Sequence, residues 1–160
     1  MHYMEETVDS RIIYEGRIIR VKEDTVRLHN GNLAKRELVE HPGGVGIVAY
    51  TPDGTIIFVR QFRKPYEEEV LEIPAGKLEP GEDHCLGGKR ELEEETGFQA
   101  QQFMYLGGFY PSPGYCGEVI HLYYADGLTP GKTHPDPDEF VDVLEFSPEQ
   151  VEHMIQIGEI

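Results

Sequence analysis

The residues with the greatest capacity for chemistry are the charged ones at positions 90–95. Their sequence, RELEEE, places four carboxylates and one guanidinium in six consecutive residues. The run lies in a segment, 84–96, that predicts a helix, so residues three and four apart share a face. Glu91, Glu94 and Glu95 then fall within an arc of roughly 100°. Their repulsion costs roughly 0.2–0.5 kcal/mol per pair. A hard cation such as Mg²⁺ would offset that cost, whereas an isolated acidic run is more often a solvated face.

The residues before this run favour the metal interpretation. A glycine, Gly76, is followed after five residues by Glu82 and after seven more by RELEEETGF, which ends at Phe98. This arrangement resembles the Nudix box, GX5EX7REUXEEXGU, where U is an aliphatic or bulky apolar residue. Nine specified positions at fixed spacing match, so chance agreement is a poor explanation.

The box implies a set of metal ligands. Glu91 and Glu95, one helical turn apart, are expected to hold Mg²⁺, with Mn²⁺ as the alternative cation. Glu94 is expected to be a third ligand or to support the other two. The resemblance adds the carbonyl of Ala75 as a further ligand.

Other box residues are expected to position these ligands. Arg90 is expected to pair with Glu94 or with Glu82 and hold the carboxylates in place, so Arg90 and Glu94 join the catalytic candidates. Gly76 permits a tight turn into the site, and Gly97 completes the box. Glu93 is expected to be a bystander.

Residues downstream of the box bear on the substrate. Pro113 lies sixteen residues after Gly97, which resembles the mark of the ADP-ribose pyrophosphatase subfamily. Ser112 lies in the same loop, and Glu118 falls where relatives often carry an acid. We expect these three residues to bind substrate, although the loop could also be a plain surface turn. In the acidic segment 136–141, Glu139 matches the general base or extra metal ligand of relatives; the alternative is a solvated loop.

Residues upstream of the box also resemble the subfamily. Arg63, in the run 59–63, is expected to grip a phosphate or the terminal ribose, although arginines on a strand can line a solvated edge. The segment 35–43 resembles the strand that helps to hold the adenosine half. Arg36 and Glu37 are the candidates there.

Composition narrows the class of protein. The formal net charge of −16 argues against broad contact with a nucleic-acid backbone. The longest apolar runs are too short to span a membrane, and residues 1–6 form no signal peptide. With only Cys85 and Cys116, reduced thiols in a cytoplasm fit better than a disulfide framework.

The chain divides into two predicted parts. Residues 1–43 form a β region in which two hairpins turn near Glu15-Gly16 and at His29-Asn30-Gly31. These strands hold few large apolar residues and need a partner surface. The resemblance implies a homodimer that exchanges these N-terminal strands.

Residues 44–160 form the predicted Nudix catalytic domain, of the α/β class. We expect an α/β/α sandwich with a mixed sheet, a helix from His84 to Thr96 and a second helix that starts at Ser147. Gly87 and Gly88 each cost about 0.5–1 kcal/mol relative to alanine, so we expect a looser first half of the first helix. Further strands are expected at 45–50, 55–62, 70–73, 103–110, 119–125 and 140–146. The turn signal at Pro52-Asp53 is expected to join the first two of these strands in a hairpin.

The expected function is Mg²⁺-dependent hydrolysis of the pyrophosphate bond of ADP-ribose to AMP and ribose 5-phosphate. One alternative is a broader nucleoside diphosphate sugar hydrolase that prefers ADP-glucose or GDP-mannose. Another, from a different class, is a sensor that binds ADP-ribose without cleaving it. Such sensors generally lose box carboxylates, and all of them are present here.

Overall fold

The computed structural model describes residues 3–132 and 140–160, and the chain forms two compact units. The first consists of Met1–Gly43 and Phe109–Ile120. The second consists of Gly44–Gly108 and His121–Ile160. The sequence had not indicated that residues 109–120 join the N-terminal β region.

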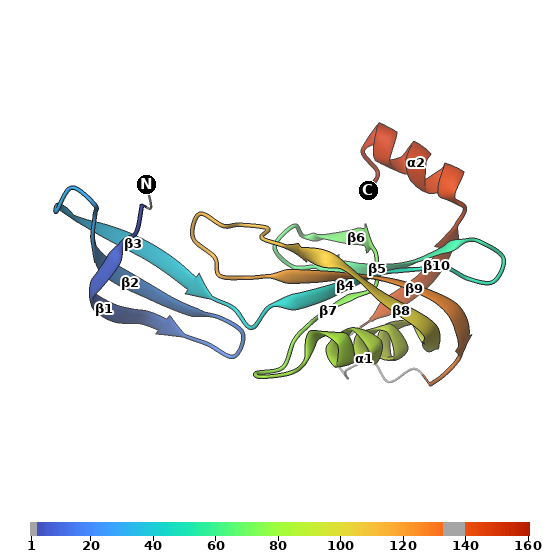
Figure 1. Ribbon diagram of the computed structural model, residues 1–160. Coiled ribbons are helices and arrows are strands. Elements are labelled where there is room, and N and C mark those ends of the chain that lie inside the picture. The colour runs from blue at the N-terminus through green and yellow to red at the C-terminus, as the bar shows by residue number, and fades with distance from the viewer. Residues whose placement is uncertain (1–2, 133–139) are drawn as a thin grey trace. The chain divides into compact units, whose positions relative to one another are not determined.

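The first unit contains an antiparallel sheet of order β1-β2-β3 (Figure 1, blue to cyan). Its strands are β1 (Glu6–Glu15), β2 (Arg20–Arg27) and β3 (Leu33–Glu40). The two predicted hairpins therefore share β2. Gly31 has φ +84° in the turn between β2 and β3, a conformation that suits glycine.

Much of the apolar surface of this sheet is exposed. Every residue of β1 is exposed to solvent in the single chain. The exposed large apolar side chains of β1 and β3 are Val8, Ile12, Ile13, Tyr14 and Leu33. A small sheet with so little of its apolar surface buried is marginal alone, as the sequence indicated.

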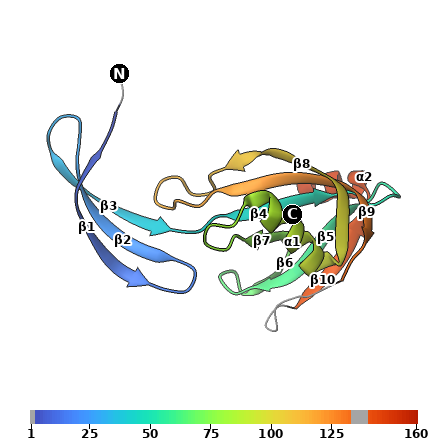
Figure 2. The ribbon, with the colours of Figure 1, turned by 60° about the horizontal axis from the view of Figure 1, so that its bottom comes forward.

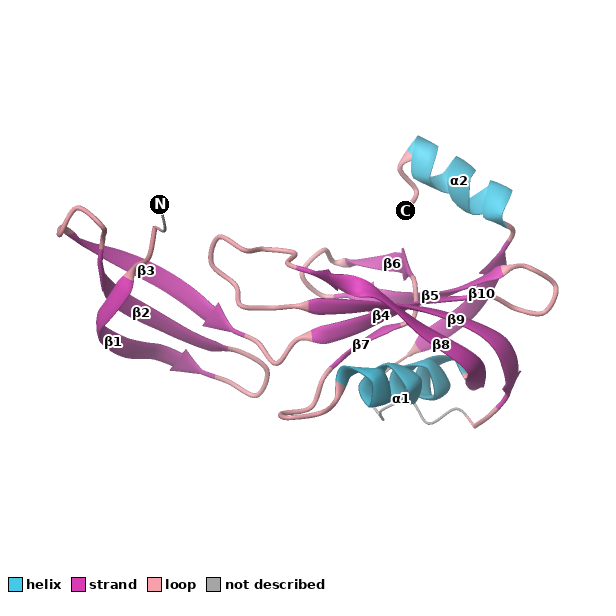
Figure 3. Ribbon diagram, viewed as in Figure 1, coloured by secondary structure: helices cyan, strands magenta, loops and turns pink. Residues whose placement is uncertain are grey.

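The second unit contains two further sheets, of order β7-β4-β9-β8 and β10-β5-β6 (Figure 3). Their strands are β4 (Gly44–Ala49), β5 (Ile56–Arg63), β6 (Glu68–Glu72), β7 (Ala75–Lys77), β8 (Phe98–Phe109), β9 (Ile120–Pro130) and β10 (Val141–Phe146). The sequence predicted β4 and β5 as one hairpin, but they lie in different sheets. A single bridge between Tyr50 and Ile56 joins them beside the turn.

Two helices flank these sheets. The first, α1 (His84–Thr96), packs against β4 and β7, and Figures 1 and 2 show the second, α2 (Pro148–Ile157), on the opposite side of the sheets. The predicted α/β/α sandwich is therefore confirmed. Neither helix in the described residues is long and apolar enough to cross a membrane.

The main core of the second unit lies between α1 and the sheet β7-β4-β9-β8. From α1 it includes Leu92, which is buried, with Gly87 and Gly88 also inaccessible. A Cβ at Gly88 would lie 2.9 Å from the ring of Phe103, and one at Gly87 would lie 2.6 Å from Leu78. The two glycines thus bring a continuous helix close to its neighbours. The buried core residues are Val45, Ile47, Ala49, Ile57, Leu78, Leu92, Tyr123, Ala125 and Leu128.

Candidate active site

The ends of α1 fix the positions of its charged residues. At the N-terminus, the Asp83 carboxylate accepts hydrogen bonds from the backbone N–H groups of Cys85 (2.9 Å) and Leu86 (3.1 Å). At the C-terminus, Gly97 adopts φ 74° and its N–H donates to the carbonyl of Glu93. The helix is regular between these caps, so residues 90–95 keep helical spacing.

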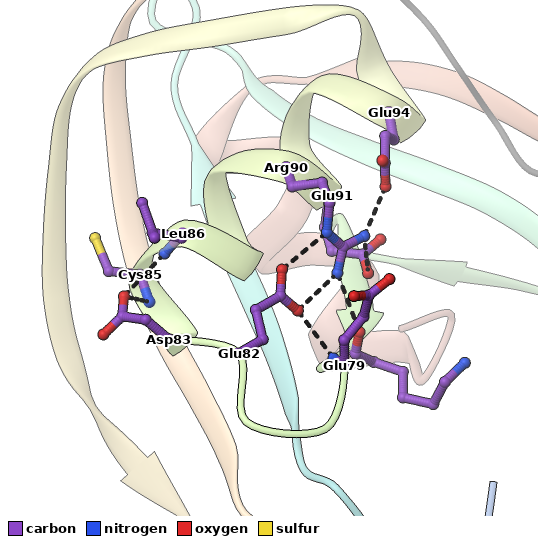
Figure 4. Close-up of polar contacts among 9 residues, drawn as sticks. Glu79, Glu82, Asp83, Cys85, Leu86, Arg90, Glu91 and Glu94 are labelled. Carbon is purple, nitrogen blue, oxygen red and sulfur yellow. Dashed lines mark hydrogen bonds and ion pairs between the residues drawn. The ribbon is translucent and has the colours of Figure 1, made fainter.

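One guanidinium collects three carboxylates near the middle of this helix (Figure 4). Arg90 donates to both oxygens of Glu82 at 3.0 Å, to Glu91 at 2.9 Å and to Glu94 at 2.7 Å. It also donates to the carbonyl of Lys77 at 3.3 Å. The sequence offered Glu82 or Glu94 as the partner, and the structure contains both. We call Arg90, Glu82, Glu91 and Glu94 the Arg90 clamp.

The clamp has an excess of negative charge. Three carboxylates against one guanidinium leave two negative charges, and Glu95 lies one position further along the helix. The hydrogen bond from Arg90, with a smaller contribution from the Glu79 N–H, holds the pKa of Glu82 below its ordinary value. The hydrogen bond to Glu82, together with the charges of Glu91 and Glu94, raises the pKa of Arg90, so this group stays charged.

Two carboxylates of the box lie against the strand that precedes the helix. A Cβ at Gly76 would lie 1.9 Å from the carboxyl carbon of Glu91, so only glycine permits this approach. Glu95 is 7% exposed and accepts a hydrogen bond of 3.0 Å from the Ala75 N–H. The short strand β7 therefore forms one wall beside Glu91 and Glu95.

These residues fit a hard divalent cation by their chemistry. Within residues 3–132 and 140–160, no three or more His, Cys, Asp or Glu side chains are arranged as a ready metal site. Glu91 and Glu94 instead both accept hydrogen bonds from Arg90. All the candidate side-chain donors are nevertheless carboxylate oxygens, and their negative charge exceeds that of the single cation among them.

Arg63 belongs to another ion pair in this unit. Its Nε and Nη2 donate to the two oxygens of Glu72 at 2.6 and 2.8 Å. A two-point contact of this kind fixes the plane of the guanidinium. Sequence reasoning missed Glu72, which lies on β6, the strand paired with β5 that carries Arg63. The sequence predicted a strand at 70–73 but did not indicate its partner strand.

The other predicted substrate residues belong to the first unit. Arg36 pairs with both oxygens of Glu5, at 2.9 and 2.5 Å, and Glu37 is exposed on β3. In the loop, the carbonyl of Ser112 accepts a hydrogen bond of 2.9 Å from the Cys116 N–H.

A cavity of about 410 Å³ lies in this first unit, where the loop meets β3. Pro113 is one of its lining residues. Nearby in the sequence, a carboxylate oxygen of Glu118 lies 3.4 Å from Nδ1 of His41, which also lines the cavity. Glu139, the predicted base, lies outside the described residues.

Comparison with family models decides the family. The model of the NUDIX domain matches residues 40–159, which include the whole box. The chain belongs to the Nudix family. Nudix hydrolases generally depend on a divalent metal. Residues 5–45 match a second model, the nucleoside diphosphate sugar hydrolase N-terminal domain.

Individual relatives match most of the length of the chain. A methanol dehydrogenase activator of Bacillus methanolicus is 46% identical over 147 residues, covering 91% of this chain and 80% of the relative. An ADP-ribose pyrophosphatase of Bacillus subtilis is 42% identical over 158 residues, covering 98% and 85%. A GDP-mannose pyrophosphatase of Yersinia enterocolitica is 32% identical over 136 residues, covering 78% and 70%.

A solved structure supports the fold of this Nudix chain. The crystal structure of an ADP compounds hydrolase superposes with a TM-score of 0.82, covering 98% of this chain and 83% of the other. The sequences are 23% identical, so this similarity concerns the fold alone.

Proposed function

We propose that this Nudix chain hydrolyses the pyrophosphate bond of ADP-ribose and releases AMP and ribose 5-phosphate. The observation that carries the proposal is the Arg90 clamp, which gathers carboxylates on the helix that also bears Glu95. The substrate is supported by the similarity to the ADP-ribose pyrophosphatase of Bacillus subtilis over almost the whole chain.

Mg²⁺, with Mn²⁺ as the alternative, is the proposed cofactor. Glu91, Glu94, Glu95 and the carbonyl of Ala75 would hold it, and when bound it neutralises the pyrophosphate and orients one phosphorus for in-line attack. The guanidinium of Arg90 keeps two of these carboxylates aligned, as it does in the present structure.

Glu139 is proposed as the general base. It would accept a proton from the attacking water, whose oxygen forms the new bond to phosphorus while the bridging oxygen leaves with the other phosphate. This residue lies outside the described part of the chain, so the proposal rests on its place in the sequence.

Substrate contacts are proposed for residues of both units. Arg63, held by Glu72, carries a fixed positive charge suited to a phosphate or the terminal ribose. In the first unit, Ser112, Pro113 and Glu118 are proposed to bind substrate, and so are Arg36 and Glu37 for the adenosine half. The support is the resemblance of the segments in which they lie.

The deciding experiment is product analysis with ADP-ribose and Mg²⁺. Wild type should release AMP and ribose 5-phosphate, and Glu95→Gln should be slower by at least about 100-fold, because a bound metal supplies several kcal/mol of transition-state stabilisation. Glu152→Gln, an exposed site on α2, is the matched control and should keep wild-type activity. An inactive wild type, or an undiminished rate in Glu95→Gln, would contradict the proposal.

A broader nucleoside diphosphate sugar hydrolase is the second candidate. The 32% identical GDP-mannose pyrophosphatase of Yersinia enterocolitica favours it. A panel of ADP-ribose, ADP-glucose and GDP-mannose separates the two by kcat/KM. Tight ADP-ribose binding without turnover would instead favour the sensor.

The proposed assembly is a homodimer in the cytoplasm. The exposed apolar side chains of β1 support a partner surface, and both cysteines are free thiols. The net charge of −16 supports a small substrate over a nucleic acid.

A further inference from the structure

Two carboxylates of β6 lie on the same face of the sheet as Arg63. In the antiparallel pair of β5 and β6, Arg63 lies directly opposite Glu68, and Val59 lies opposite Glu72. Opposed residues of two strands point to the same face of a sheet, and so do residues two and four apart on one strand. Glu68 and Glu72 are therefore both candidate partners for Arg63, and Glu68 is the nearer one by register.

Arg63 nevertheless binds the more distant carboxylate. Its Nε and Nη2 donate to the two oxygens of Glu72 at 2.6 and 2.8 Å. Glu72 is four residues beyond Glu68, which is roughly 13 Å along an extended strand. The side chain of Arg63 thus extends along the sheet, past the opposed pair Gln61 and Val70, toward the end of β6.

Burial favours this distant partner. The side chain of Glu72 is 24% exposed and both of its oxygens accept hydrogen bonds, whereas Glu68 is exposed to solvent. Attraction between charges strengthens where water is partly excluded, and a two-point contact adds to it. The backbone of Arg63 is fixed as well, because its carbonyl accepts hydrogen bonds from the N–H groups of Tyr66 (2.9 Å) and Glu67 (3.0 Å). Only the side chain can therefore move between the two acids.

A short and well-anchored segment joins Glu72 to the wall of the candidate active site. Glu72 lies three residues before Ala75, so their Cα atoms are at most roughly 11 Å apart. Between them, Pro74 is fully buried, and its carbonyl accepts a hydrogen bond of 2.8 Å from the Ile47 N–H. The Ala75 N–H in turn donates to Glu95 at 3.0 Å. The acid that binds the guanidinium is thus fixed with respect to a proposed metal ligand.

We propose that Glu72 is a positioning residue, which keeps the guanidinium of Arg63 away from Glu68 and holds it at the end of β6 that leads into the candidate active site. The inference rests on the proposed function, in which Arg63 binds a phosphate or the terminal ribose. A guanidinium has two edges that can each donate a pair of parallel hydrogen bonds. Glu72 binds the Nε–Nη2 edge, so the substrate meets the edge formed by Nη1 and Nη2. Without Glu72, the guanidinium turns back to Glu68 and this contact with the substrate is lost.

The test combines substitutions of the two acids. In Glu72→Ala, KM for ADP-ribose should rise about 10- to 100-fold, as for other residues that orient a binding group, with kcat within about threefold. Glu68→Ala, the matched control at the opposed acid, should keep both constants within about twofold of wild type. The double variant should have a KM at least about threefold below that of Glu72→Ala, because no second acid then captures the guanidinium.

An Arg63→Ala background shows whether Glu72 acts through Arg63. Adding Glu72→Ala to Arg63→Ala should change KM by less than about twofold, because the group that Glu72 positions is already absent. Melting temperatures of all the variants should stay close to that of wild type, since a partly exposed ion pair contributes little to stability. A further tenfold rise in KM in the Arg63→Ala background would overturn the inference.

A crystal structure of Glu72→Ala gives a result that does not depend on turnover. The guanidinium of Arg63 should lie within hydrogen-bond distance of Glu68, and any other position would overturn the inference. If wild type fails to hydrolyse ADP-ribose, the proposed function fails alone and this structure still decides the role of Glu72.

An active wild type leaves the proposed function standing while the kinetic results decide the role of Glu72. An unchanged KM in Glu72→Ala would overturn that role. A lower KM would also overturn it, because Glu72 would then only weaken the charge of Arg63. An equal rise in KM in Glu68→Ala would overturn it as well, since the two acids would then be equivalent.

Discussion

Gly76 shows how one missing side chain shapes the site. Its α-carbon faces the carboxylate of Glu91 so closely that a methyl group would lie 1.9 Å from the carboxyl carbon. Glu91 cannot yield freely, since Arg90 holds it at 2.9 Å. Flexibility of the turn is therefore only part of the reason for glycine here; the other part is the space taken by the Glu91 carboxylate.

We expect Gly76→Ala to lower both activity and stability. The displaced Glu91 should reduce kcat by about 100-fold, the cost typical of misplacing a catalytic group by about 1 Å. The melting temperature should also fall, because overpacking costs about 1–3 kcal/mol. In a Glu91→Ala background the clash is absent, so adding Gly76→Ala should leave the melting temperature nearly unchanged. A similar drop in both backgrounds would show that Glu91 is not the cause.

At the residue scale, sequence reasoning succeeded where contacts follow from local spacing. Arg90 and Glu94 are four positions apart on one helix, so their pairing was foreseeable. The same reasoning missed the contact of Arg63 with Glu72, because this contact joins two neighbouring strands. It also missed the contact of Glu93 with Lys132, because no local rule relates residues 39 positions apart.

The N-terminal end of α1 depends on one side chain. Asp83 accepts two backbone hydrogen bonds there. Asp83→Ala should therefore destabilise the fold by about 1 kcal/mol, while Asp83→Asn, which still caps, should cost much less. Urea unfolding of the three proteins measures the difference. Equal losses in both variants would indicate that charge and not capping is responsible.

An aromatic cluster lies beside the first turn of the same helix. The rings of His84 and His121 stack with centroids 4.0 Å apart, and Nδ1 of His84 lies 2.5 Å from the hydroxyl of Tyr123. The hydroxyl of Tyr105 lies 3.1 Å from Nδ1 of His121. Burial, with repulsion from His84, lowers the pKa of His121 below its ordinary value of 6.5.

This cluster should make stability depend on pH. Because the pKa of His121 is lower in the folded chain, the unfolded chain takes up the proton first. The stability that His121 contributes is thus present above about pH 6.5 and lost as pH falls through the folded pKa. His121→Phe should flatten the decline in melting temperature between about pH 7 and pH 5, and His153→Phe, at an exposed site on α2, should not. An unchanged slope in His121→Phe would contradict this account.

At the element scale, the sequence predicted the elements better than their pairing. The helix 84–96 was foreseen because its cap and its apolar spacing agree. The separation of β4 and β5 into two sheets was not foreseen, since a turn signal such as that at Pro52-Asp53 fixes a reversal but not the later course of the strands. The three-residue strand β7 carries too few residues for a periodic pattern.

At the scale of the whole molecule, the exposed face of β1 predicts self-association. Light scattering should give about twice the chain mass of 18.2 kDa. Ile12→Lys should shift the protein toward the monomer, because it places a charge among exposed apolar side chains. Thr7→Lys, an exposed polar site on the same strand, is the control and should stay dimeric. A monomer mass for wild type would remove the dimer from the proposal.

The Arg90 clamp also predicts whether the chain folds before or after it binds a metal ion. Crowded carboxylates usually destabilise a chain that lacks its cation, but here an internal guanidinium already binds three of them. The polypeptide should therefore reach its native state before any ion is loaded. Chelation should abolish the hydrolytic activity without unfolding the chain, and readdition of Mg²⁺ should restore the activity. The supply of ions would then control the activity of protein that is already folded.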